Sequence, residues 1–198
     1  MEDQLLRVFS RDGAGFPLRT LLGAIRTAGH PAAFSTGIAG EATEEELQSE
    51  DWAAVFLRWT EPELHDAALI ERDLVSESDD ARADIRAALQ DVANSNDPAG
   101  QLIVADHLRR TVAVYSVQIL PAVLAQDDHA AWGALDVILR CIAAQTEGLI
   151  AVPGEGYCDA EGELLLADSE DEVGVENETV DTPAGEYFDE LEEEPEQA

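Results

Sequence analysis

Residues 53–59 read Ala-Ala-Val-Phe-Leu-Arg-Trp, and residues 67–75 read Ala-Ala-Leu-Ile-Glu-Arg-Asp-Leu-Val. Both runs are short and largely apolar, with the β-branched and aromatic side chains that are typical of strands. The connection between them contains Glu61-Pro62-Glu63, where a proline beside polar residues favours a turn. We therefore predict two strands that pair antiparallel.

The sequence before these strands carries helical patterns. Residues 1–9 are predicted to form a short helix and residues 17–28 a longer one, because their apolar side chains would share one side of a helix. Residues 43–48 are predicted to form a brief acidic helix, since Thr43 and Glu46 match the capping-box pattern. The apolar positions are Leu5, Leu6 and Phe9 in the first segment and Leu18, Leu21, Leu22 and Ile25 in the second.

The sequence after the two strands alternates between helical and extended patterns. The predicted elements are helices over 79–94, 99–109 and 127–147 and strands over 111–120, 149–152 and 163–167. Asp97 followed by Pro98 is typical of a helix start, and Gly148 is typical of a helix end. The order of elements predicts an α+β fold, a single domain with a mixed or antiparallel sheet flanked by helices.

The C-terminal residues differ from the rest of the chain in composition. Residues 168–198 contain 14 carboxylates, no cation and few large apolar side chains. Such a segment buries too little apolar surface to offset the entropy lost on ordering it. We therefore predict an acidic α+β domain over 1–167, followed by a disordered acidic tail over 168–198.

The net charge of −32 divides into −18 on the predicted domain and −14 on the predicted tail. A field of this sign repels phosphates and anionic lipid headgroups, so we expect no direct nucleic-acid binding, no membrane binding, and a basic protein partner. All 11 cations are arginine and none is lysine. A biased coding composition or adaptation to high salt accounts for that absence, and selection against lysine modification is the alternative.

The expected location is the cytoplasm. The opening residues Met1-Glu2-Asp3-Gln4-Leu5-Leu6 lack the basic start and the long apolar run of a secretory signal. No run of about 18 apolar residues predicts a helix that spans a membrane. The two cysteines do not make a disulfide framework.

No motif in the sequence predicts catalysis, a cofactor or a metal ion. No two of the four histidines (His30, His65, His107, His129) have the i, i+4 spacing that aims two imidazoles at one zinc ion. Neither Cys141 nor Cys158 has the setting of a nucleophile. Gly13-Ala14-Gly15 lacks a fuller glycine fingerprint and a predicted preceding strand, so we interpret it as a flexible joint. Residues 159–163 resemble part of a calcium loop but are predicted to form a hairpin turn.

Two acidic segments are the candidates for partner binding. In the predicted tail, one helical turn would group Tyr187, Phe188 and Leu191 among carboxylates, and such segments fold on contact with a basic, partly apolar groove. The second candidate lies in the acidic block 41–51, at Glu44, Glu45 and Glu46. We also hypothesise that the tail folds back onto the N-terminal helices, which bear Arg7, Arg11, Arg19 and Arg26, until a more basic partner displaces it.

These observations favour a non-enzymatic acidic binding protein that masks a basic partner, as an inhibitor, an immunity-type protein or a chaperone-like protein. The reason is electrostatic: a negative charge on this protein speeds its encounter with a basic partner and selects against acidic competitors. One alternative is an enzyme or small-ligand domain whose site is assembled from distant residues, first sought at Asp106, His107, Arg109 and Arg110. The other is a structural accessory subunit.

Overall fold

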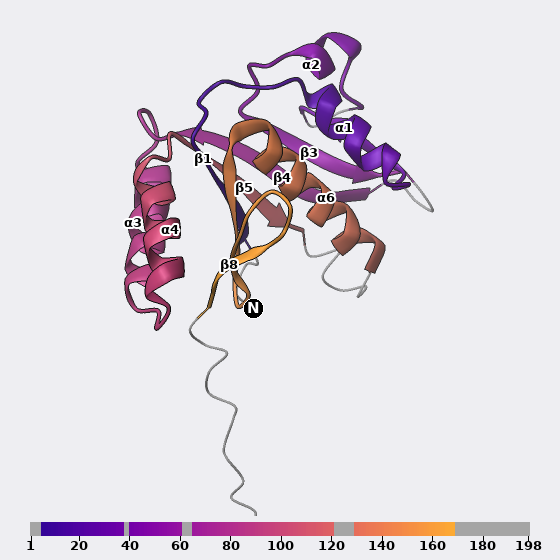
Figure 1. Cartoon of the computed structure of the whole chain (residues 1–198). Coiled ribbons are helices and arrows are strands. Elements are labelled where there is room, and N and C mark those ends of the chain that lie inside the picture. The colour runs from indigo at the N-terminus through magenta and orange to yellow at the C-terminus, as the bar shows by residue number, and fades with distance from the viewer. Residues whose placement is uncertain (1–4, 38–39, 61–64, 121–128, 169–198) are drawn as a thin grey trace, which may run out of the picture.

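The computed structural model describes residues 5–37, 40–60, 65–120 and 129–168, and their strands form one continuous sheet (Figure 1). The strand order is β2-β3-β4-β5-β1-β6-β7-β8, and every neighbouring pair is antiparallel. The strands are β1 Leu5–Ser10, β2 Ala32–Ser35, β3 Ala54–Trp59, β4 His65–Leu74, β5 Ala113–Ile119, β6 Gly148–Val152, β7 Gly156–Cys158 and β8 Leu164–Ala167. The predicted α+β class is confirmed, with the sheet antiparallel rather than mixed.

The helices cover the two faces of this sheet unequally. The helices are α1 Leu18–Thr27, α2 Glu44–Gln48, α3 Asp79–Ala93, α4 Pro98–Arg109 and α6 His129–Thr146. Residues of α1 and α6 pack into the larger core on one face, and residues of α3 and α4 pack into a smaller core on the other. Figure 1 shows α3 and α4 side by side, away from α1 and α6. No helix within the described residues is long and apolar enough to cross a membrane.

The larger core is organised around the fully buried ring of Tyr115 on β5. The rings of Phe16 and Trp52 lie 6.1 and 5.8 Å from it, centroid to centroid. The indole nitrogen of Trp52 donates to the Phe16 carbonyl at 2.8 Å, so the buried N–H has its partner. Burial raises the pKa of the Tyr115 hydroxyl, which keeps it protonated.

The described part of the N-terminal segment is a strand, and the predicted helix over 1–9 is wrong there. β1 pairs with β5 on one side and β6 on the other, which makes it an interior strand of the sheet. Val8 and Phe9 are both buried but belong to the cores on opposite faces. A strand covered on both faces reads as a continuous apolar run, which periodicity alone does not separate from a helix.

The structure differs from the sequence predictions in three further places. β2 was missed, because Ala32–Ser35 is only four residues long and has no β-branched side chain. The predicted closing pair is a meander of three strands, in which β7 lies between β6 and β8. Gly148 opens β6 instead of ending α6, and the chain turns at Glu147, whose φ is 49°.

Several other predictions are confirmed. β3 and β4 form the predicted antiparallel hairpin. Thr43 and Glu46 form a capping box that starts α2, and Asp97 caps α4, whose first residue is Pro98. Asp127 and Asp128, the predicted start of the longest helix, lie outside the described residues, as do residues 169–198, which include Tyr187, Phe188 and Leu191.

Candidate functional site

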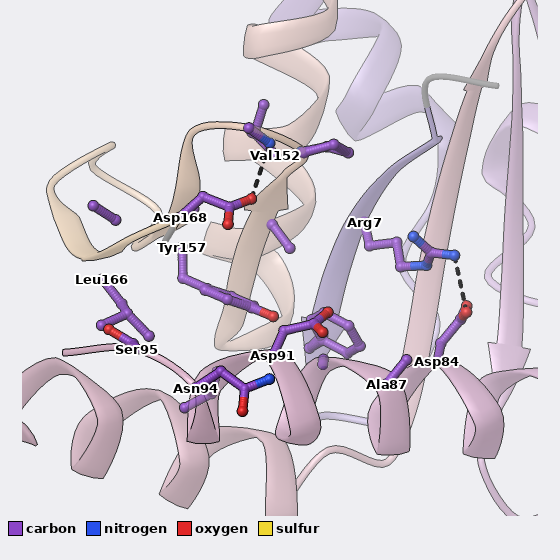
Figure 2. Close-up of a pocket in the computed structure, with 18 of the residues that line it drawn as sticks. Arg7, Asp84, Ala87, Asp91, Asn94, Ser95, Val152, Tyr157, Leu166 and Asp168 are labelled. Atoms are coloured by element: carbon purple, nitrogen blue, oxygen red, sulfur yellow. Dashed lines mark hydrogen bonds and ion pairs between the residues drawn. The ribbon is translucent and has the colours of Figure 1, made fainter. Parts of the chain in front are cut away.

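A cavity of about 410 Å³ lies between α3 and the strands β1, β6, β7 and β8, and we call it the α3 pocket (Figure 2). Its polar lining consists of Arg7, Asp84, Asp91, Asn94, Ser95, Tyr157 and Asp168. These residues are far apart in the sequence, and the antiparallel register brings the strand residues together. Arg7 lies opposite Ala151, Ala151 opposite Tyr157, and Tyr157 opposite Leu166, so they share one face of the sheet.

Arg7, the one cation among the described residues that line the pocket, is already neutralised. A guanidinium nitrogen of Arg7 donates to the carboxylate of Asp84 at 2.9 Å, and both side chains are about three-quarters buried, with 28% and 25% of their surface exposed. The Nε–H of Arg7 is buried and has no hydrogen-bond partner among the described residues. The pair therefore ties β1 to α3 and leaves little positive charge for a ligand.

Two further carboxylates line the pocket, and both act on one phenol. Burial and the negative charges of Asp91 and Asp168 raise the pKa of Tyr157 to about 12. Asp168 accepts a hydrogen bond from the backbone N–H of Gly154 at 3.2 Å, whereas the Asp91 side chain is exposed. Neither carboxylate forms an ion pair within the described part of the chain. In Figure 2, Tyr157 and Asp91 lie between Asp168 and the Arg7–Asp84 pair.

The floor of the pocket is apolar. Phe9, Val92 and Leu166 line it and are 1%, 2% and 3% exposed. Beside this floor stands the half-buried Tyr157, whose hydroxyl remains protonated at neutral pH. The combination of an apolar floor, an aromatic ring and two unpaired carboxylates is suited to a cationic group on an apolar stem, such as a lysine or arginine side chain.

The structure gives the three acidic residues predicted on α2 different surroundings. Glu44 pairs with Arg19 on α1, and Glu46 accepts hydrogen bonds from Thr36 and Thr43, which lower its pKa. The side chain of Glu45 is exposed and has no partner among the described residues. Two of the three carboxylates thus hold α2 in place. The role of all three in partner binding stays a prediction.

The N-terminal arginines are already engaged within the domain. Arg7 pairs with Asp84, Arg11 with Asp106 at 3.5 Å, and Arg19 with Glu44, while Arg26 donates to the Ala32 carbonyl. Moreover, Arg7 lies on a strand, and Arg11 directly follows it. These contacts weaken the hypothesis that the tail docks on arginine-bearing N-terminal helices.

The residues of the cluster at the end of α4 have separate surroundings. Asp106 bridges Arg110 at 2.9 Å and Arg11. His107 points inward, where its Nε2 donates to the Phe9 carbonyl at 2.8 Å, and burial lowers its pKa. Arg109 is exposed and forms no hydrogen bond or ion pair with another described residue. Asp106, Arg109 and Arg110 therefore lie at the surface, whereas His107 points towards the smaller core.

The remaining candidate residues, His30, Cys141 and Cys158, pack against other residues of the fold. His30 stacks on Trp59, with ring centroids 6.3 Å apart. Burial raises the pKa of both the Cys141 and the Cys158 thiol, which disfavours thiolates. No group of three metal-ligating side chains occurs among the residues that the structure describes. The side chains of His65 and His129 lie outside that description.

Two loop predictions have different outcomes. The segment 159–163 forms the predicted turn, in which the Asp159 carboxylate accepts from the Glu163 backbone N–H at 2.8 Å. Gly13-Ala14-Gly15 follows a strand after all, namely β1, and is anchored to its neighbours. A Cβ on Gly15 would lie only 1.8 Å from the Glu50 carbonyl oxygen, and the Gly13 carbonyl accepts from Arg72. Glycine at position 15 thus serves close backbone packing.

The polar lining of the α3 pocket was not found from the sequence, since it joins residues from β1, α3, β7 and the end of β8.

Comparison of the chain with protein-family models, with curated proteins and with solved structures finds no match. The case for a function therefore rests on the geometry and charge of the described residues.

Proposed function

We propose that this protein is a non-enzymatic acidic binding protein for a basic protein partner, and that a lysine or arginine side chain of the partner enters the α3 pocket. The observation that carries the proposal is the pairing pattern inside the pocket. Arg7, the only cation in the described lining, is paired with Asp84, whereas Asp91 and Asp168 have no described cation to neutralise them. A partner cation would complete this arrangement and bury its apolar stem against the floor.

The surface charge outside the pocket supports the same proposal. Most of the arginines form ion pairs with carboxylates of the domain itself, so carboxylates remain in excess. Four of the exposed carboxylates lie in or beside α2, at Glu41, Glu45, Glu50 and Asp51. A large opposite charge speeds the encounter with a basic protein, and a fitted pocket adds specificity. Masking of a basic surface in an inhibitory, immunity-type or chaperone-like manner is part of this proposal.

The cytoplasm is the location that we propose for this interaction. The supporting observation is the state of the two cysteines, Cys141 and Cys158, which are both free. Proteins of oxidising compartments often join such residues into disulfides, and cytosolic proteins rarely do.

A second candidate function is the binding of a small cationic ligand in the same pocket. The cavity of about 410 Å³ lies within the range of roughly 300–1,000 Å³ that is usual for small-molecule sites. It is also assembled from distant residues. In this case the ligand would be an amine or guanidine with an apolar body, recognised by the same two carboxylates.

The test is a titration of the isotope-labelled full chain with N-acetyl-arginine amide, followed by nuclear magnetic resonance. We expect the signals of Tyr157 and its neighbours to shift on titration, and the shift to disappear in the variant Asp91→Asn/Asp168→Asn. The control variant Glu71→Gln/Glu77→Gln removes the same charge from exposed positions outside the pocket and should respond like the native chain. Equal responses from both variants would reject the pocket as the cation site.

A further inference from the structure

The outer face of α4 combines exposed apolar side chains with exposed cations. Leu102 is 70% exposed and Ile103 is 53% exposed, although α4 buries Val104 and Leu108 on its other side. About two turns further along stand Arg109, the last residue of α4, and Arg110, the C-cap of the helix. We call these four residues the α4 face.

The helical spacing places both kinds of residue in one stripe. Leu102 and Arg109 are seven residues apart, and a separation of two turns returns a side chain to the same side of a helix. Arg110 directly follows α4 as its C-cap and is held beside this stripe by its ion pair with Asp106. Arg109 has no partner among the described residues. Arg110 shares Asp106 with Arg11, so two arginines face one carboxylate beside it. The α4 face is thus a locally cationic and apolar surface in a strongly acidic protein.

The chemistry of the α4 face selects an acidic, partly apolar occupant. It would repel the basic partner proposed above, so it is not a second contact for that partner. The chain itself contains a segment with the complementary chemistry, Glu186-Tyr187-Phe188-Asp189-Glu190-Leu191, followed by Glu192, Glu193 and Glu194. Tyr187 and Phe188 precede all but one of the carboxylates of residues 186–194, and on α4 the apolar pair likewise precedes the arginines.

The end of the described chain lies close to the start of α4. Residues 164–168 and residues 95–97 line one groove of about 310 Å³, and a Cβ on Gly100 would lie 2.5 Å from the Leu165 carbonyl oxygen. Figure 1 shows β8 ending beside the helix pair α3 and α4. A random coil with the 19 residues of the step from Asp168 to Tyr187 would span roughly 25 Å on average. The length of α4 is about 18 Å. The segment therefore reaches the α4 face at little entropic cost.

We propose that residues 186–194 dock intramolecularly on the α4 face, with the apolar side chains of the segment on Leu102 and Ile103 and its carboxylates on Arg109 and Arg110. The docking does not depend on the basic partner or on the α3 pocket. The proposal assigns this cationic–apolar surface to a segment of the same chain. A tethered segment is present at an effective concentration of millimolar order, so a weak contact is sufficient for docking.

The experiment compares methyl and arginine side-chain resonances of three full-length chains: the native protein, the variant Tyr187→Ser/Phe188→Ser/Leu191→Ser, and the control variant Val173→Ser/Val175→Ser/Val180→Ser. Both variants remove three apolar side chains outside the described domain. We expect the methyl signals of Leu102 and Ile103 to move in the first variant, through loss of aromatic ring-current shifts, and to keep their native positions in the control. Raising the salt concentration of the native protein should move them the same way, because screening weakens the arginine contacts.

Three results would overturn the proposal. The first is a set of Leu102 and Ile103 signals that is identical in the native chain and in the aromatic variant. The second is an equal displacement by the control variant, which would indicate a general effect of the segment after Asp168. The third is a signal position that changes on dilution of the native protein, since that would assign the contact to the segment of a second copy.

Discussion

A guanidinium nitrogen of Arg7 on β1 lies 2.9 Å from a carboxylate oxygen of Asp84 on α3, so an interior strand is joined to the helix that covers it. The contact spans 77 sequence positions and forms one wall of the α3 pocket. It ties α3 to the sheet, and the carboxylate of Asp84 offsets the positive charge of Arg7 near Asp91 and Asp168. The acidity of the pocket depends on this pair.

Breaking the pair should destabilise the fold. The substitution Asp84→Ala leaves a largely buried guanidinium without its partner, so we expect the free energy of unfolding to fall by about 1–3 kcal/mol. Chemical denaturation measures this change. The substitution Glu71→Gln, at an exposed position, should change stability by less than about 0.5 kcal/mol. Similar small effects of both substitutions would show that the pair does not hold α3.

The titration of Tyr157 should respond to the pocket carboxylates. Burial and the charges of Asp91 and Asp168 raise its pKa to about 12, because each disfavours the phenolate. In Asp91→Asn/Asp168→Asn we expect a lower pKa that stays above the ordinary value of 10.0, since the burial remains. Carbon-13 spectra of the tyrosine rings, recorded at increasing pH, measure this shift. An unchanged pKa would mean that the two carboxylates do not act on the phenol.

His107 should make stability fall in mildly acidic solution. Burial lowers its pKa in the folded chain below the ordinary 6.5, so the unfolded chain takes up the proton first as the pH falls. Its contribution is complete above about pH 6.5 and is lost as the pH drops towards the folded pKa. The difference in unfolding free energy between the native protein and His107→Gln should therefore shrink from about pH 7 to about pH 5. Parallel stability curves for the two proteins would contradict this linkage.

Gly156 should be far less tolerant of a side chain than Gly154. Both have positive φ, 113° and 79°, but a Cβ on Gly156 would lie 2.1 Å from the Leu166 carbonyl oxygen, whereas a Cβ on Gly154 meets nothing within 4 Å. We expect Gly154→Ala to cost about 1 kcal/mol, from the backbone conformation alone. Gly156→Ala should cost about 3 kcal/mol or more, because β7 must also move away from β8. Thermal or chemical denaturation compares the two, and equal costs would reject the steric explanation.

The parts of the fold with local signals could be predicted from the sequence. Thr43 and Asp97 are helix caps, and the proline-containing connection between β3 and β4 indicates a hairpin. The interactions that favour these elements are made between residues close together in the sequence. β1 lacks such a signal. Its neighbours β5 and β6 come more than a hundred residues later. The cores on the two faces of the sheet, which bury Val8 and Phe9 respectively, are likewise built from distant segments. Tertiary context decided between strand and helix there.

The candidate site was less accessible to sequence analysis. In a chain with 43 acidic residues, no pattern singles out Asp91 and Asp168, because their special position comes from the register that puts Tyr157 on the same face as Arg7. The excess of carboxylates over arginines was visible from composition. Some arginines are neutralised inside the domain, and others, such as Arg109, remain exposed. Contacts between distant segments decide between the two outcomes, and these contacts cannot be read from composition.

The most direct test of the proposed function is affinity capture from an extract of the source cells at low salt, with three immobilised full-length proteins. These are the native chain, Asp91→Asn/Asp168→Asn, and Glu71→Gln/Glu77→Gln, of which the two variants carry the same net charge. We predict that one basic protein is retained by the native chain and by the second variant, is lost from the pocket variant, and elutes as the salt concentration rises. Retention of the same proteins by all three, or of none by the native chain, would contradict the proposal of a basic partner in the α3 pocket.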